Sequence, residues 1–85
     1  MNPRIEIAGI ELEVIQVTAS HVYLENPRFP SVAAGGANTD GAIKEFLKLL
    51  PDLITEYALC PDDKLSADGK ELKYYLLECF NRQRL

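Results

Sequence analysis

Residues 5–25, with the sequence IEIAGIELEVIQVTASHVYLE, alternate apolar and polar side chains over most of their length. This period of two is typical of β-strands that bury one face. From Ile43 onward the apolar side chains recur every three or four residues, which is the spacing of amphipathic helices. The sequence therefore predicts a β-sheet half over residues 1–26, a connector over residues 27–41 and a helical half over residues 42–85.

The first part of the sheet half is interpreted as a β-hairpin that turns at Ala8-Gly9. A two-residue turn fixes which residues face each other across the two strands. The expected pairs are Ile7 with Ile10 and Ile5 with Leu12 on the buried side, and Glu6 with Glu11 and Arg4 with Glu13 on the other side. The outer side of this hairpin is therefore expected to be acidic and solvated.

The alternation changes phase after Val14, because Ile15 and Val17 fall out of step with the apolar residues before them. A β-bulge would explain this change, and so would a strand that is covered on both faces.

A third strand is expected over residues 21–25, with Val22 and Leu24 facing inward. Asn26-Pro27 ends it, since proline has no N–H to donate to a neighbouring strand. The three strands together predict an antiparallel meander, and its inner face is expected to cover the helices. That face consists of Ile5, Ile7, Ile10, Leu12, Val14, Val22 and Leu24.

The connector over residues 27–41 contains two prolines and three glycines, and it is long for so small a protein. One interpretation is a mobile link between the two halves. Another is a segment that orders when a partner binds, with Phe29 and Val32 as its apolar anchors. A phosphate cradle is disfavoured, because the connector has no lysine followed by serine or threonine.

The first helix is expected to begin after Thr39 or Asp40, either of which is a suitable N-cap. Pro51 lies inside its apolar stripe, so we expect a kink there, or a break at which Pro51 opens a second short helix. The stripe stays in phase across Pro51, which favours the kink. The stripe itself consists of Ile43, Phe46, Leu47, Leu50, Leu53, Ile54 and Tyr57.

The last helix is expected after the helix stop at residues 60–64. Asp68, with Glu71 three residues later, resembles a capping box that would start this helix. Its apolar stripe consists of Leu72, Tyr75, Leu76, Cys79 and Phe80. The predicted fold class is α+β, as one domain of 85 residues in which the three-stranded meander packs against two or three C-terminal helices.

The formal net charge of −4 argues against a general nucleic-acid binder, which needs a basic face to neutralise phosphates. Most of the acid excess lies in the sheet half, where four glutamates accompany a single arginine. No apolar run approaches the length of a membrane span, and Cys60 and Cys79 are interpreted as reduced thiols near helical packing positions. These features predict a cytoplasmic protein.

Residues suited to catalysis or metal binding are sparse. His21 is the only histidine and is expected on the outer strand face, and the two cysteines have no metal-site spacing. The sequence therefore predicts no enzymatic activity, no metal and no cofactor. A small-ligand or enzymatic site near His21 and the glycine-rich connector remains a third possibility, which would need a concave pocket.

Parts of the helical half resemble small phage tail-assembly chaperones. The resemblance is carried by Leu49-Leu50-Pro51-Asp52-Leu53-Ile54, by the break at Cys60-Pro61-Asp62-Asp63 and by Leu76-Leu77-Glu78-Cys79-Phe80-Asn81. The opening Ile5-Glu6-Ile7-Ala8-Gly9-Ile10 is similar to the short hairpin that often begins such proteins. The resemblance implies a non-enzymatic role in virion assembly through partner binding, and it brings no catalytic residues with it.

Two ways of binding a protein follow from the surface residues. Apolar residues outside the buried stripes predict a contact with a partner or a second copy of the chain, and we expect Tyr74, Leu77, Leu49 and Phe29 to take part in it. The alternative is an acidic inhibitor that occupies the nucleic-acid-binding surface of a partner. Its acidic face would consist of Glu6, Glu11, Glu13 and Glu25.

Overall fold

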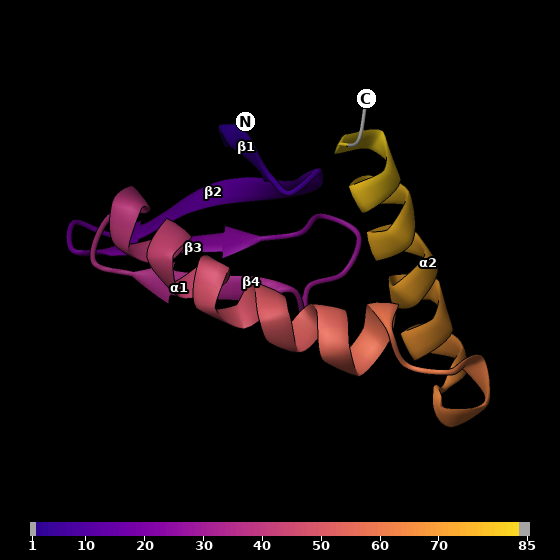
Figure 1. Ribbon diagram of the computed structural model, residues 1–85. Helices are drawn as coiled ribbons and strands as arrows, with labels where there is room; N and C mark the ends of the chain where they lie inside the picture. Colours follow the sequence, from indigo (N-terminus) through magenta and orange to yellow (C-terminus); the bar gives the residue numbers. More distant parts are fainter. Residues whose placement is uncertain (1, 84–85) are drawn as a thin grey trace.

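The computed structural model describes residues 2–83 and has an α+β architecture, in which four antiparallel strands precede two helices. The strands are β1 (Arg4–Ile7), β2 (Ile10–Thr18), β3 (His21–Glu25) and β4 (Ala33–Gly36), and the helices are α1 (Thr39–Leu53) and α2 (Ala67–Gln83). The strands follow one another across the sheet in chain order. Helix α1 runs alongside the sheet, and α2 crosses one end of it (Figure 1).

The predicted hairpin is confirmed in its register. Arg4 faces Glu13, and Ile7 faces Ile10, with the two pairs between them as expected. The turn works because Ala8 and Gly9 both have positive φ, of 54° and 81°, which matches the twist of a two-residue hairpin. Gly9 also lies against α2, since a Cβ added there would stand 2.3 Å from the carbonyl oxygen of Cys79.

The predicted change of phase in β2 is a β-bulge. Val17 is the extra residue, because Gln16 faces Val22 while Thr18 faces His21. Ile15 precedes the bulge and faces Tyr23, on the opposite side of the sheet from the core. The third strand spans residues 21–25 as expected, and its Val22 and Leu24 are buried.

The prediction that residues 27–41 form a connector outside the sheet is wrong, because this segment contains a fourth strand, β4. β4 pairs with β3, and Val32 just before it is fully buried. The strand has no β-branched residue, so its formation depends on the ladder with β3 and on close packing under α1. At Gly36 an added Cβ would lie 2.5 Å from the backbone nitrogen of Ala42 in α1. Only glycine avoids this clash.

Helix α1 begins one or two residues earlier than expected, since neither Thr39 nor Asp40 is its N-cap, and it continues through Pro51. Asn38 is the N-cap, since its Oδ1 accepts a hydrogen bond from the Gly41 backbone N–H over 2.8 Å. Of the two alternatives expected at Pro51, a kink or a break, the break is wrong, because α1 runs through Pro51 to Leu53. Leu47, expected in the buried stripe, is about half exposed.

A π-helical turn (Ile54–Ala58, η1) extends α1 directly. The N–H of Leu59 donates to the carbonyl oxygen of Ile54 over 2.8 Å, a spacing of five residues. The wider turn brings Ala58 into the protein, where it is buried. The helical irregularity therefore lies after Pro51 rather than at it.

Helix α2 begins at Ala67, after a short 3-10 turn (Asp62–Lys64, η2). The predicted capping box at Asp68 is wrong, because Ser66 Oγ accepts the hydrogen bond from the Gly69 N–H over 3.1 Å. The predicted stripe is confirmed: Leu72, Leu76 and Cys79 are buried, and Tyr75 and Phe80 pack against them. These residues meet the inner sheet face and α1 in one core. Cys60 and Cys79 are free thiols.

Candidate functional site

The loop between η1 and α2 is fastened to α2 by two neighbouring side chains. Lys73 Nζ donates to the carbonyl oxygen of Cys60 and to Asp62 Oδ1, both over 2.7 Å. The Tyr74 hydroxyl donates to the other carboxylate oxygen of Asp62. One carboxylate and one backbone carbonyl of the loop are therefore held by consecutive residues of the helix.

This arrangement shifts the acid–base behaviour of its members. The Lys73 ammonium and then the Tyr74 hydroxyl hold the pKa of Asp62 below its ordinary value, because both donate to the charged carboxylate. Asp62 in turn raises the pKa of Lys73, by favouring its charged form. It also raises the pKa of Tyr74, since the hydroxyl must keep its proton to donate.

Two large apolar side chains remain open to solvent beside this fastened loop. Tyr74 is 53% exposed although its hydroxyl is bound, and Leu59 in the loop is 73% exposed. The ammonium of Lys73 lies 5.9 Å from the centroid of the Tyr74 ring. Leu77, also expected at a contact surface, is only partly exposed. We therefore take the exposed Tyr74 and Leu59 as the candidate contact residues, and call them the Tyr74–Leu59 face.

The other two predicted contact residues contribute to the core instead. Leu49 and Phe29 are partly buried and pack against the central cluster. The Phe29 ring lies 5.2 Å from the ring of Tyr75, and the Arg28 guanidinium lies 5.2 Å from the Phe29 centroid. The expectation that Leu49 lies outside the buried residues is therefore wrong, and Phe29, expected as an apolar anchor of the connector, also packs against the core.

Asn26 organises the segment that carries Phe29, a larger role than the end of a strand that the sequence predicts for it. Its Oδ1 accepts from the backbone N–H groups of Arg28 and Phe29, over 2.9 and 2.8 Å. Its side-chain amide donates to Glu11 O and to the Tyr75 hydroxyl, over 2.9 and 2.8 Å. Asparagine before proline at a strand end commonly forms such a turn, and this signal was present in the sequence.

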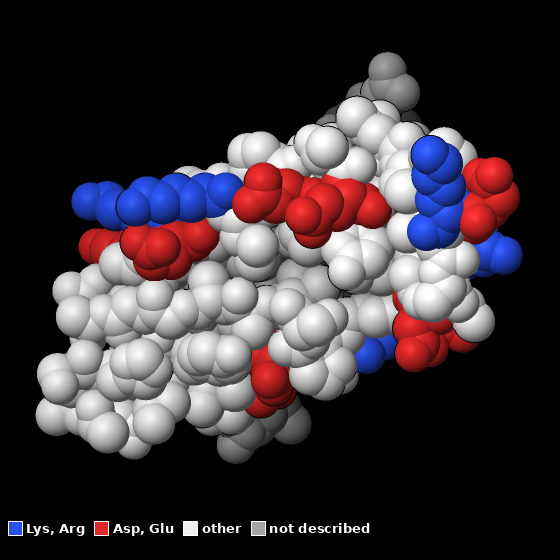
Figure 2. Space-filling view, turned by 90° about the horizontal axis from the view of Figure 1, so that it is seen from below, with Lys and Arg blue, Asp and Glu red and all other residues white. Residues whose placement is uncertain are grey.

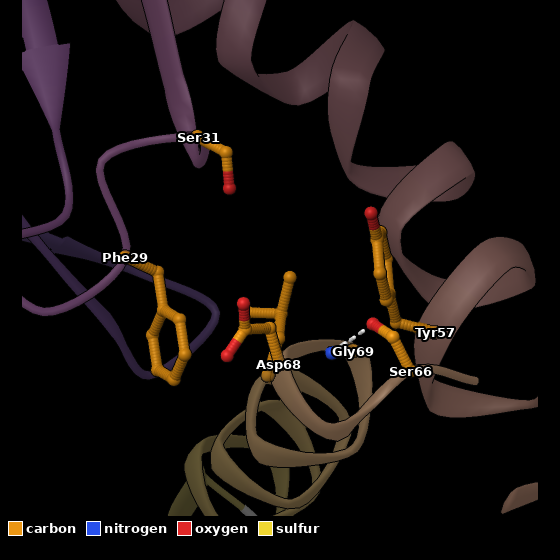
Figure 3. A pocket seen from close by; sticks show the side chains of 7 residues that line it. Phe29, Ser31, Tyr57, Ser66, Asp68 and Gly69 are labelled. Carbon is orange, nitrogen blue, oxygen red and sulfur yellow. Dashed lines mark hydrogen bonds between the residues drawn. The ribbon is translucent and has the colours of Figure 1, made fainter.

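A hollow of about 170 Å³ opens where this segment, η1 and the start of α2 meet. Phe29 and Tyr57 stand on opposite sides of it, with the Asp68 carboxylate between them and Ser31 above (Figure 3). Its lining consists of Phe29, Ser31, Tyr57, Ser66, Asp68, Gly69 and Leu72. The hollow therefore combines aromatic, hydroxyl and carboxylate groups from three separate parts of the chain.

The predicted acidic face is present on the outer side of the sheet. Glu6 lies directly opposite Glu11, and Glu13 lies opposite Glu25, so like charges are neighbours across the strands. Arg4 relieves part of this repulsion through ion pairs with Glu11 and, at 4.0 Å, with Glu13. The structure therefore brings the four glutamates together, with one cation among them.

The residues considered for catalysis do not come together. His21 is exposed and stacks beside Tyr23, with ring centroids 6.5 Å apart. Cys79 is fully buried, with the Arg82 guanidinium 3.4 Å from its sulfur. Within residues 2–83 no group of three or more His, Cys, Asp or Glu side chains is placed to hold a metal ion. The hollow that Phe29 and Ser31 of the connector help to line is not lined by His21.

The surface seen from below in Figure 2 carries both signs of charge. Charged side chains form a band across the upper part of that view, and a broad uncharged area lies beneath it.

Among the described helices, none is long and apolar enough to cross a membrane. No protein-family model, curated protein or solved structure matches the chain.

Proposed function

We propose that this protein is a small non-enzymatic protein-binding module of the assembly or adaptor type. The observation that supports it is the exposed Tyr74 ring, whose hydroxyl donates to Asp62 in the loop that also carries the exposed Leu59. Tyrosine is among the residues that contribute most to protein interfaces, because its ring buries a large area and loses little conformational freedom.

Preorganisation makes this face suitable for binding. An exposed side chain loses rotational freedom when a partner covers it, and that loss weakens association. Tyr74 is already restricted by the hydrogen bond to Asp62, and Lys73 fixes Asp62 from the other side. A partner that covers Tyr74 and Leu59 therefore costs less conformational entropy than one that binds to a loop with no such hydrogen bonds.

The resemblance to phage tail-assembly chaperones specifies the kind of partner that we propose, namely a protein of virion assembly. The residues that carry it include Cys60-Pro61-Asp62-Asp63 and the end of α2, which border the Tyr74–Leu59 face in the chain. Tail or capsid genes beside the gene for this chain would support that assignment. A neighbourhood of unrelated metabolic genes would count against it.

The experiment compares Tyr74→Ser and Leu59→Ser with the unaltered protein. Both variants, and the double variant above all, are expected to weaken association while circular dichroism shows an unchanged fold. Self-association is measured by sedimentation equilibrium, and partner capture by quantitative pull-down. Tyr74→Phe keeps the ring and removes the hydroxyl, so it separates contact area from the hydrogen bond with Asp62.

Val17→Ser is the matched control, because Val17 is 57% exposed but lies in the β2 bulge. It is expected to leave association unchanged. Equal association of the Tyr74→Ser, Leu59→Ser and Val17→Ser proteins would exclude the Tyr74–Leu59 face as the contact.

A second candidate is supported by the register of the sheet, which gathers Glu6, Glu11, Glu13 and Glu25 on one face. We propose as the alternative that this face occupies the nucleic-acid-binding surface of a partner. Such binding depends on exposed charges and should weaken steeply between about 0.05 and 0.5 M salt, as charge screening shortens the range of attraction. A complex that is insensitive to salt would exclude this alternative.

A further inference from the structure

The hollow between Phe29 and Tyr57 has the chemical character of a site for a positive charge. We propose that it binds the cationic side chain of a lysine or arginine that a partner protein presents. This inference rests on the proposed function as a protein-binding module, and it adds a second, separate point of contact to the Tyr74–Leu59 face.

The two aromatic walls supply the first part of the site. The face of an aromatic ring attracts a cation that lies within about 6 Å of its centroid. Phe29 and Tyr57 enter the hollow from the segment before β4 and from η1, so a side chain inserted there lies between two aromatic walls (Figure 3). The neighbouring Arg28 places its guanidinium 5.2 Å from the Phe29 centroid, which is within the distance at which a ring attracts a cation.

The walls are held in place before any ligand arrives. The backbone N–H of Phe29 is bound by the buried Asn26, and its ring packs at 5.2 Å from the Tyr75 ring. Tyr57 packs against the core from the π-helical turn. A site whose walls are already ordered loses little entropy on binding, which is favourable for so small a ligand group.

Asp68 supplies the negative charge. It is the only ionisable carboxylate among the residues that line the hollow, and within residues 2–83 it makes no ion pair. Asp62, by contrast, is already paired with Lys73. The carboxylate of Asp68 therefore remains available for a charge-assisted hydrogen bond to a ligand ammonium or guanidinium.

The same groups disfavour an anion. The start of a helix ordinarily attracts negative charge through its free N–H groups. Here Ser66 already accepts from the Gly69 N–H, and the Asp68 carboxylate occupies the space in front of the first turn (Figure 3). The net charge of −4 adds a long-range preference for cations.

The test is an amide-resolved NMR titration of the full chain with three probes: Nα-acetyl-lysine methylamide, Nα-acetyl-arginine methylamide and Nα-acetyl-norleucine methylamide. The two cationic probes are expected to shift the amide resonances of residues 29–31, 57 and 66–72 with saturable, millimolar affinity. Norleucine has a similar length without the charge, and it should bind at least about fivefold more weakly. The stronger of the two cationic probes identifies ammonium or guanidinium as the preferred group.

Asp68→Asn is expected to reduce the affinity for the cationic probes at least about fivefold, because it removes the charge and keeps the shape. Asp63→Asn is the matched control, since Asp63 is exposed and lies outside the hollow. Equal binding of norleucine, equal binding by Asp68→Asn, or an absence of saturable shifts near Phe29 would each overturn the proposal. Tyr74→Ser should leave probe binding unchanged, so a failure of the cation site is distinguishable from a failure of the proposed function.

Discussion

The side-chain amide of Asn26 donates a hydrogen bond to the hydroxyl oxygen of Tyr75 over 2.8 Å, and it so joins the end of β3 to the middle of α2. Asn26 is fully buried, yet both of its side-chain polar atoms have two partners each. A buried amide that is satisfied in this way fixes the geometry around it. The position of Phe29, and with it one wall of the hollow, depends on this residue.

Asn26→Ala is therefore expected to lower the free energy of unfolding by about 2–4 kcal/mol, because it leaves part-buried backbone groups of Glu11, Arg28 and Phe29 without their partner. Urea unfolding followed by circular dichroism measures the change. Asn81→Ala, an exposed position of α2, is the control and should stay within about 0.5 kcal/mol. A loss at Asn26 no larger than at Asn81 would contradict the role of this network.

Burial raises the pKa of the Tyr75 hydroxyl above its ordinary value near 10, and the donated bond from Asn26 only partly opposes this. The folded state therefore holds the proton more tightly than the unfolded state. The resulting stability is fully present below about pH 10 and is lost as the pH rises through the pKa of the folded protein. Tyr75→Phe should show a shallower fall of unfolding free energy above pH 10 than the unaltered protein. Parallel alkaline curves for the two proteins would refute this assignment.

Gly9 has a backbone φ of 81° and lies directly under α2. Gly9→Ala should lower the free energy of unfolding by more than about 2 kcal/mol, because left-handed backbone strain adds to a contact of 2.3 Å with Cys79 O. Gly41→Ala is the matched control, and it is expected to change the free energy of unfolding in the opposite direction. Its Cβ would meet nothing closer than 3.4 Å, so the higher helix propensity of alanine should stabilise α1 by about 0.5–1 kcal/mol. Thermal unfolding of both variants measures the difference.

The hairpin was predictable because its register follows from a two-residue turn and a period of two, both of which are local in the sequence. β4 was not predictable in this way, because Ala33-Ala34-Gly35-Gly36 has no strand preference of its own. Its formation depends on β3 beside it and on Gly36 beneath Ala42, both of which are tertiary contacts.

The candidate site also has parts that the local sequence predicts and parts that depend on tertiary contacts. Tyr74 was identifiable as a surface residue from the periodicity of the last helix, and the structure leaves it exposed. Phe29 was identified as an apolar anchor, but its position against Tyr75 depends on Asn26. The approach of Tyr57 and Asp68 to Phe29 joins three distant segments, and no local pattern in the sequence encodes that meeting.

The contact between Asp62 and Lys73 gives the fastened loop a dependence on acid pH. The hydrogen bond from Lys73, and then that from Tyr74, lowers the pKa of Asp62 below its ordinary value of 3.8. The stability that this pair adds is present above pH 3.8 and is lost as the pH falls through the pKa of the folded protein. The carboxyl ¹³C resonance of Asp62 should therefore titrate with a midpoint below 3.8, and exchange of the loop amides should quicken as it does.

Lys73→Met tests the cause of this shift. It removes the donor to Asp62 Oδ1 and to Cys60 O, and it keeps much of the aliphatic part of the side chain. The midpoint of Asp62 should then rise toward 3.8. Lys70→Met is the control, because Lys70 acts on Asp62 only as a weaker, non-bonded charge. If both variants moved the midpoint equally, general charge rather than the Lys73 hydrogen bond would hold the carboxylate ionised, and the loop beside Tyr74 would lose its proposed fastening.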